Sequence, residues 1–200
     1  MSNVGEATDL PATRDPDQQT LEACRRGQSG AFDVLVERHQ RRVFRLAVRL
    51  LGDEEAALDA AQETFVKVLN AVESYRPEFK FSSWIFKIAN NTAIDHLRRR
   101  NLDTLSLDGS PHAESADAVE ATTLQISDGA ESALEEVTAR ELGKQIEVAI
   151  AQLRPEYRAC ILLRHVEGRP YEEIAEMLDL PLGTVKTYIH RARNELRILL

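Results

Sequence analysis

The residues with the clearest chemistry lie near the C-terminus, in the run 171–193, YEEIAEMLDLPLGTVKTYIHRAR. At about 100° per residue, a helix there gathers Val185, Ile189 and Ala192 on one side. The opposite side then carries hydrogen-bond donors and positive charge, from Thr187, His190, Arg191, Asn194 and Arg197, with Lys186 and Arg193 on a flank. A helix that is apolar on one side and lined with donors on the other fits the major groove of DNA.

A shorter helix is expected to position this one. Ile174, Ala175 and Leu178 form an apolar stripe before a break at 179–183, which contains a Pro and a Gly. Thr184 is expected to cap the second helix, so that the pair forms a helix-turn-helix. The alternative is an ordinary helical hairpin with a solvated charged face. Residues 184–200 hold four basic residues and one acidic residue in a chain of net charge −8, and this local excess favours DNA binding.

A second group of polar residues lies in the run 58–69, LDAAQETFVKVL. On a helix whose core face is Ala61, Phe65, Val68, Leu69 and Val72, Asp59 and Glu63 are expected to project outward one turn apart, beside Gln62. Like charges at this spacing repel, and a basic partner protein would offset the cost. The alternative is a solvated polar face.

The run 75–84, YRPEFKFSSW, places aromatic rings among basic residues, a pattern suited to single-stranded nucleic acid. The rings can equally be core residues. We expect Trp84 to be core and Phe81, next to a Lys and two Ser, to be exposed. Further along, the amides of Asn90 and Asn91 can bind a base edge. The run Arg98–Arg99–Arg100 can bind phosphates or simply offset the helix dipole.

Helical periodicity elsewhere predicts an all-α chain of two small helical domains. Residues 1–17 are expected to be disordered, 18–100 to form a four-helix bundle, 101–130 to be a flexible linker and 131–200 to form the second domain. Asp17 is expected to cap the first helix. Helices are expected near 18–27, 30–51, 54–74, 81–100, 139–153 and 156–166.

Composition narrows the classes of function. Nine acids and no Lys or Arg lie in 101–136, whereas 76–100 holds six basic residues and two acids, so the chain has two basic patches around an acidic linker. The two cysteines, Cys24 and Cys160, lack metal-ligand spacing, and neither a cofactor nor a metal is expected. No catalytic constellation is visible, so the protein is not expected to be an enzyme. No apolar run suits a membrane span, and a cytoplasmic location is expected.

Two motif sets resemble the extracytoplasmic-function (ECF) sigma factors of the sigma-70 family. The first is DAAQETFVKV followed by FSSWIFKIANNTAIDHLRRR, and the second is RPEYRACILLRHVEGRPYEEIAEMLDLPLGTVKTYIHRARNEL. They occur in the family's order around a variable linker and cover about 18–100 and 131–200, which would be sigma regions 2 and 4.

The resemblance implies roles for individual residues. Asp59, Gln62 and Glu63 match the helix that binds the β′ clamp helices of core RNA polymerase. A set in the first domain would contact the minus-10 promoter element, where a base is flipped out of the duplex: Phe81, Trp84, Lys87, Asn90, Asn91, Arg98, Arg99 and Arg100. A set in the second domain would contact the minus-35 element: Thr184, Lys186, Thr187, His190, Arg191 and Arg193.

The implied partners are core RNA polymerase, through β′ and the β flap, promoter DNA both duplex and melted, and an anti-sigma factor. Two alternatives stay open at the level of sequence. An autonomous helix-turn-helix regulator would bind DNA without polymerase, usually as a dimer. A sigma-like decoy for an anti-sigma factor need not keep a basic recognition helix.

Overall fold

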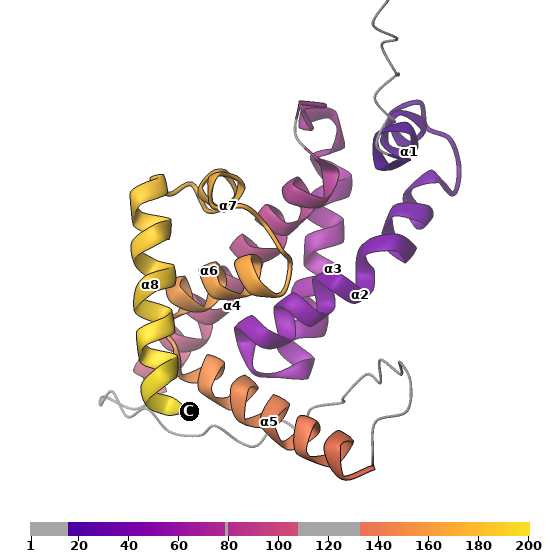
Figure 1. The fold of residues 1–200 in the computed structure, drawn as a ribbon. Coiled ribbons are helices and arrows are strands. Elements are labelled where there is room, and N and C mark those ends of the chain that lie inside the picture. The colour runs from indigo at the N-terminus through magenta and orange to yellow at the C-terminus, as the bar shows by residue number, and fades with distance from the viewer. Residues whose placement is uncertain (1–15, 79, 108–132) are drawn as a thin grey trace, which may run out of the picture.

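The computed structural model describes residues 16–78, 80–107 and 133–200. Every regular element in these ranges is a helix, which confirms the all-α prediction. None of the helices in the described ranges combines the length and the apolar composition that a membrane crossing requires. The elements are α1 (Pro16–Arg25), α2 (Ala31–Leu51), α3 (Glu54–Asn70), the 3-10 turn η1 (Val72–Ser74), α4 (Phe81–Leu107), α5 (Ala133–Gln152), α6 (Pro155–His165), α7 (Tyr171–Leu178) and α8 (Leu182–Leu199) (Figure 1).

The N-terminal group is built on α2, which packs against α1, α3 and α4. Its interior contains apolar residues that recur at helical spacing on α2, including Leu35, Val43 and Leu50. They pack with buried residues of α4, including Phe81 and Ile85. The corner between α2 and α3 is made by Gly52, whose φ of 69° lies in the left-handed region that glycine adopts at little cost. Asp53 then caps α3, accepting a hydrogen bond from the Ala56 amide at 2.9 Å.

The C-terminal group consists of α6, α7 and α8, with α5 leading into it. Pro155 begins α6 at a position where its missing N–H costs nothing. The turn between α7 and α8 passes through Asp179, which adopts a left-handed conformation with φ of 53°. The expected cap at Thr184 is wrong, because α8 begins at Leu182, directly after Pro181, and Thr184 lies inside its first turn.

The predicted role of Asp17 is also wrong. Asp17 lies within α1 instead of before it, and it is buried. Its carboxylate accepts a hydrogen bond from Arg38 at 2.6 Å and lies 2.8 Å from Nε2 of His39. Asp17 therefore fixes α1 on α2, and a polar contact between helices takes the place of a cap.

The two groups of helices pack on each other. The prediction of two domains joined by a flexible linker did not include this contact. α7 lies on α4, and both α5 and α6 contact α2. The buried Arg158 of α6 donates to the carbonyl of Leu50 at 2.6 Å and to the carbonyls of Ala151 and Leu153, so one guanidinium joins the ends of α2 and α5. Within the predicted linker, α4 continues as far as Leu107. The predicted disorder before residue 16 and the remaining linker, 108–130, lie outside the described residues.

Candidate nucleic-acid and partner interfaces

The outer face of α8 is the clearest candidate for binding a ligand. Val185, Ile189 and Ala192 are fully buried against α6 and α7, as their spacing predicts. α8 lies along an edge of the molecule (Figure 1), and its opposite side is open to solvent. The exposed residues include Lys186, Thr187, His190, Arg191 and Arg193, whereas Thr184 is half-buried. The helix therefore presents one continuous basic and polar surface.

Several of these side chains are held in place by neighbours. The Arg191 guanidinium donates to the Tyr157 hydroxyl at 3.2 Å, and the Thr187 hydroxyl donates to the Gly183 carbonyl at 2.8 Å. Nη2 of Arg193 lies 3.2 Å from Nε2 of His165. Burial, followed by the charges of Arg193 and Arg164, lowers the pKa of His165, which favours a neutral ring that accepts from Arg193.

The three polar residues predicted on the outer face of α3, Asp59, Gln62 and Glu63, do not all lie there. Asp59 and Gln62 are exposed, but Glu63 is only partly exposed and turns toward α4, so the expected pair of outward carboxylates is wrong. The exposed face contains large apolar residues that the sequence reading missed: Leu58 at 51%, Val66 at 57% and Leu69 at 48% exposure. Leu69 was expected in the core. The sequence does contain a pattern that indicates this exposed apolar face. Positions 58, 66 and 69 form a second apolar stripe, on the same side of the helix as Gln62.

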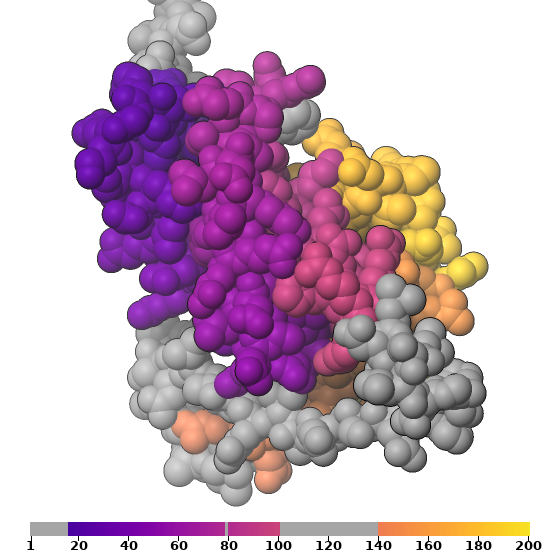
Figure 2. All heavy atoms as spheres, turned by 180° about the vertical axis from the view of Figure 1, so that it is seen from behind, coloured from indigo at the N-terminus to yellow at the C-terminus, as the bar shows by residue number. Residues whose placement is uncertain are grey.

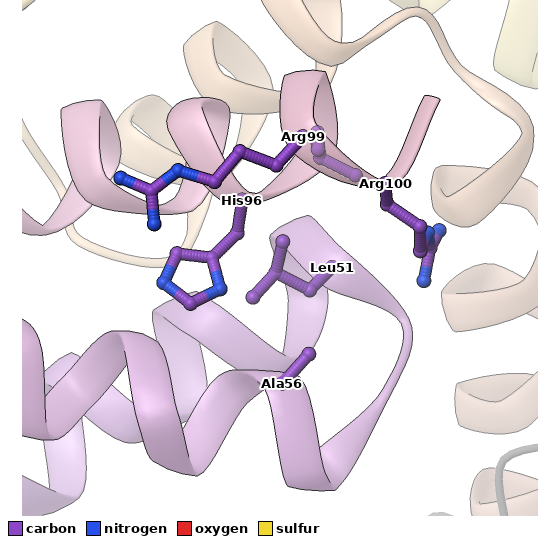
Figure 3. A pocket seen from close by; sticks show the side chains of 6 residues that line it. Leu51, Ala56, His96, Arg99 and Arg100 are labelled. Atoms are coloured by element: carbon purple, nitrogen blue, oxygen red, sulfur yellow. The ribbon is translucent and has the colours of Figure 1, made fainter. Parts of the chain in front are cut away.

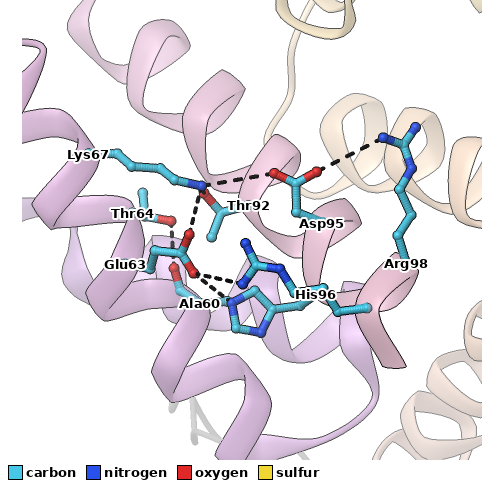
Figure 4. Close-up of polar contacts among 9 residues, drawn as sticks. Ala60, Glu63, Thr64, Lys67, Thr92, Asp95, His96 and Arg98 are labelled. Atoms are coloured by element: carbon cyan, nitrogen blue, oxygen red, sulfur yellow. Dashed lines mark hydrogen bonds and ion pairs between the residues drawn. The ribbon is translucent and has the colours of Figure 1, made fainter. Parts of the chain in front are cut away.

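Glu63 is the centre of a charged network between α3 and α4 (Figure 4). Its carboxylate lies 2.9 Å from Nζ of Lys67 and 2.8 Å from Nε2 of His96, and Arg99 is 3.9 Å away. Lys67 also donates to the Thr92 hydroxyl at 3.0 Å. Hydrogen bonds from Lys67 and then from His96 lower the pKa of Glu63. The network therefore links the outer sides of α3 and α4.

We expect Glu63→Gln to lower the free energy of unfolding by about 0.5 kcal/mol near neutral pH, since partly exposed pairs contribute little. A carboxyl whose pKa is lower in the folded state stabilises the fold above its unfolded pKa. The difference between wild type and variant should therefore be complete above about pH 4.3, and should disappear as the pH falls through the lower folded value. Urea unfolding of both proteins across this range measures it. A difference that does not change down to acidic pH would contradict the assignment.

The predicted minus-10 residues of α4 fall into three classes. Asn91 and Arg98–Arg100 are exposed, and Trp84 and Lys87 are partly exposed. Asn90 is buried, with 2% exposure. The expected exposure of Phe81 is wrong: its ring is fully buried, edge-on to His39 and Tyr75 and tilted against Trp84, with centroid separations of 5.1, 6.0 and 5.9 Å. Partners from α2 and from the segment before α4 thus make Phe81 a core residue.

Residues 96–100 of α4 form a basic rim around an open pocket of about 220 Å³, at the corner between α2 and α3. Leu51, Ala56 and Leu97 supply its apolar wall, while His96, Arg99 and Arg100 supply the polar side. Figure 3 shows Arg99 and Arg100 extending in opposite directions from the helix. Seen from the side opposite Figure 1, α3 and the outer side of α4 form one face, with α8 at its edge (Figure 2).

Comparison with known proteins identifies two family regions in this chain. Residues 35–102 match the model of sigma-70 region 2, and residues 143–196 match that of sigma-70 region 4. The RNA polymerase sigma-H factor of Pseudomonas aeruginosa is 36% identical over 183 residues, which cover 91% of this chain and 92% of that protein. The ECF RNA polymerase sigma factor SigW of Bacillus subtilis is 34% identical over 182 residues, covering 90% and 94%.

Solved structures show the same fold. The sigma factor RpoE of Bartonella quintana, crystallised with the anti-sigma factor NepR, superposes with a TM-score of 0.64 at 21% identity, over 85% of this chain and 96% of that one. CnrH in complex with the cytosolic domain of CnrY gives a TM-score of 0.62 at 23% identity, over 92% and 96%.

Proposed function

Because this chain belongs to the ECF RNA polymerase sigma factors of the sigma-70 family, we propose that it binds core polymerase and directs it to promoters with minus-35 and minus-10 elements. The observation that carries this proposal is α8, with its apolar side buried and its basic side exposed. The major groove admits a helix of this kind, and side chains near its N-terminal end reach the base edges. Lys186, Thr187, His190 and Arg191 would read bases, and Arg193, held by His165, would contact a phosphate.

The exposed face of α3 is the proposed surface for the β′ clamp helices. Large exposed apolar residues beside a carboxylate and an amide are the composition of a protein interface, with an apolar centre and a polar rim. Leu58 and Val66 would form the centre, and Asp59 and Gln62 would pair with polar or basic groups of the partner. Glu63 would act indirectly, by fixing α3 against α4.

The exposed side of α4 is the proposed surface for melted minus-10 DNA. Asn91 would bind the edge of a flipped base, and Trp84 offers part of its ring for stacking. Arg98, Arg99 and Arg100 would hold phosphates around the open pocket, with a salt dependence typical of such contacts. The buried Phe81 would support Trp84 from below without touching DNA.

We also propose that an anti-sigma factor controls this protein. The structural relatives RpoE and CnrH were solved with NepR and CnrY, respectively. In this chain, α5 keeps Leu142, Ile146 and Val148 at the surface. Exposed apolar residues of this kind suit contacts with an anti-sigma factor or with the β flap.

Run-off transcription with purified core polymerase on a genomic library tests the function. The chain should direct initiation from a defined set of promoters that share two elements. A chain that shifts promoter DNA in a native gel without core polymerase, and that directs no initiation with it, would be an autonomous regulator instead.

We expect the double substitution Leu58→Asp and Val66→Asp to weaken core polymerase binding by at least tenfold, because each places a carboxylate without a partner in the apolar centre of the interface. Both side chains are about half exposed, so the melting temperature should change little. Fluorescence anisotropy of labelled protein titrated with core enzyme measures the affinity. Val34→Asp, at an exposed apolar residue of α2, is the matched control. Equal affinities for wild type and double variant would refute the assignment of α3.

A further inference from the structure

Arg25, at the end of α1, holds the irregular backbone that leads into α4. Its guanidinium donates to the carbonyl of Val72 at 3.0 and 3.1 Å, to that of Tyr75 at 2.6 Å and to that of Glu73 at 3.4 Å. Carbonyls at the end of a helical turn lack helical donors, and a basic side chain is a usual substitute. One side chain of α1 therefore fixes three backbone groups in and directly after η1.

A second residue of α1 extends this hold further along the chain. Nε2 of Gln18 donates to the carbonyl of Pro77 at 2.8 Å. α1 is itself fixed on α2, through the buried Leu21 and through the contacts of Asp17 with α2. The bundle therefore anchors α1, and α1 in turn holds the segment 72–77.

Little of the backbone between η1 and α4 is buried. Arg76, Pro77 and Glu78 are all exposed, and so is Lys80. Tyr75 is the exception, with 4% exposure. Exposed irregular backbone that buries little apolar surface opens easily. The conformation of this part of the chain therefore depends strongly on its polar contacts with α1.

The held segment includes neighbours of the Trp84 ring. The ring centroids of Tyr75 and Trp84 are 5.2 Å apart, and the guanidinium carbon of Arg25 lies 6.0 Å from the Tyr75 centroid. The amide of Trp84 donates to the Lys80 carbonyl at 3.2 Å, so Lys80 also lies close to this residue. A displacement of 72–77 would therefore remove a packing partner from a ring that is partly exposed.

Building on the proposed function, we propose that Arg25 is a positioning residue for the minus-10 strand. It acts through the backbone after η1 and through the ring of Tyr75, and it keeps Trp84 in place to stack on a base. The same hold presents the exposed Arg76 and Lys80 near that ring, where their charges would attract phosphates of the strand. α1 thus contributes to the binding of melted DNA through a residue that does not touch it.

Arg25→Gln and Arg25→Lys separate positioning from direct contact. Both lose the planar group that reaches three carbonyls, but Lys keeps the charge. The probe is a single-stranded minus-10 oligonucleotide from a promoter identified by run-off transcription, titrated with holoenzyme assembled from each variant. Both variants should bind it about tenfold more weakly, as when about a tenth of the molecules keep the segment in place. Because no phosphate contact is lost, the slope of affinity against salt should not change.

Fluorescence anisotropy of the labelled oligonucleotide measures the affinity and the slope, and two measurements on the free chain test the hold itself. Trp84 is the single tryptophan of the chain, so its emission reports on this ring alone. Arg25→Gln should shift that emission to longer wavelength and should speed amide hydrogen exchange in 72–77, with exchange in the core of α2 unchanged. Arg26→Gln, at the exposed neighbouring arginine, is the matched control and should behave like wild type in each assay.

Gln18→Ala is a milder variant, which removes only the bond to the Pro77 carbonyl. It should lower the oligonucleotide affinity by about twofold, the effect of one exposed hydrogen bond. If Arg25→Lys binds like wild type while Arg25→Gln loses about one unit of salt slope, Arg25 is a phosphate contact and the proposal is overturned.

Two further outcomes would also overturn the positioning role. One is an oligonucleotide affinity that Arg25→Gln leaves unchanged. The other is an equal loss of affinity for core polymerase, since a positioning residue for the DNA strand leaves the exposed face of α3 intact. If the wild type itself directs no initiation, the proposed function fails and this proposal fails with it. If the wild type initiates and the Arg25 variants lose no affinity, this proposal alone fails.

Discussion

Replacing Thr187, His190 and Arg191 together by alanine will reduce promoter-specific initiation by at least a hundredfold while leaving core polymerase binding unchanged. Each good base contact contributes about 1–3 kcal/mol, and two such contacts already reach a hundredfold. All three side chains lie on the exposed side of α8. Because the Thr187 hydroxyl is bonded to Gly183, this residue would contribute mainly through its methyl group, for example against a thymine methyl. Run-off transcription and core-binding titrations of the same preparations measure the two effects.

The fold should tolerate this triple substitution, since the buried stripe of α8 is untouched. Lys144→Ala, at an exposed basic residue of α5, is the matched control and should initiate like wild type. The effect should also depend on the template. Substituting the minus-35 element should reduce wild-type initiation strongly and affect the triple variant much less. An unchanged choice of start sites by the triple variant would remove α8 as the promoter reader.

Phe81→Ala is expected to lower the free energy of unfolding by about 3–5 kcal/mol, the usual cost of emptying a fully buried phenylalanine site. A loss of this size is a large part of the total stability of a domain. The ring contacts His39, Tyr75 and Trp84, so its removal leaves a cavity between α2 and the start of α4. Urea unfolding followed by circular dichroism measures the change.

Phe81→Leu separates packing from DNA contact. Leucine refills most of the site, so we expect it to recover much of the stability and, with it, the affinity for single-stranded minus-10 DNA. If the ring instead touched a base, leucine would restore folding but not binding. A fully stable Phe81→Ala protein would contradict the burial of this residue.

The sequence predicted the helices well because apolar spacing determines which side of a helix is buried. Val185, Ile189 and Ala192 lie where their period places them, and the breaks at Gly52 and Pro155 are real. The family assignment and the all-α fold are confirmed for the same reason, since both rest on long, strongly patterned runs. The roles of individual residues in binding polymerase and DNA stay predictions.

The errors share another physical cause. Whether Phe81 is exposed depends on His39 and Tyr75. Whether Asp17 caps a helix depends on Arg38 and His39. Each of these partners is distant in the sequence, and local spacing does not identify it. Glu63 turned toward His96 for the same reason. Likewise, the contact between α4 and α7 joins residues about ninety positions apart. No periodicity within one helix reports such a pairing.

The guanidinium of Arg158 joins the two groups of helices through contacts that differ in kind from those near α7. Its contacts are neutral carbonyls at the ends of α2 and α5, and burial shields them from salt, although it also lowers the pKa of Arg158. The pairing of Lys87 with Asp179 lies near solvent, where mobile ions weaken it. Rising ionic strength is therefore expected to weaken the pairing of Lys87 with Asp179 more than the contacts of Arg158, so the two ends of the contact between the groups of helices should respond differently to salt.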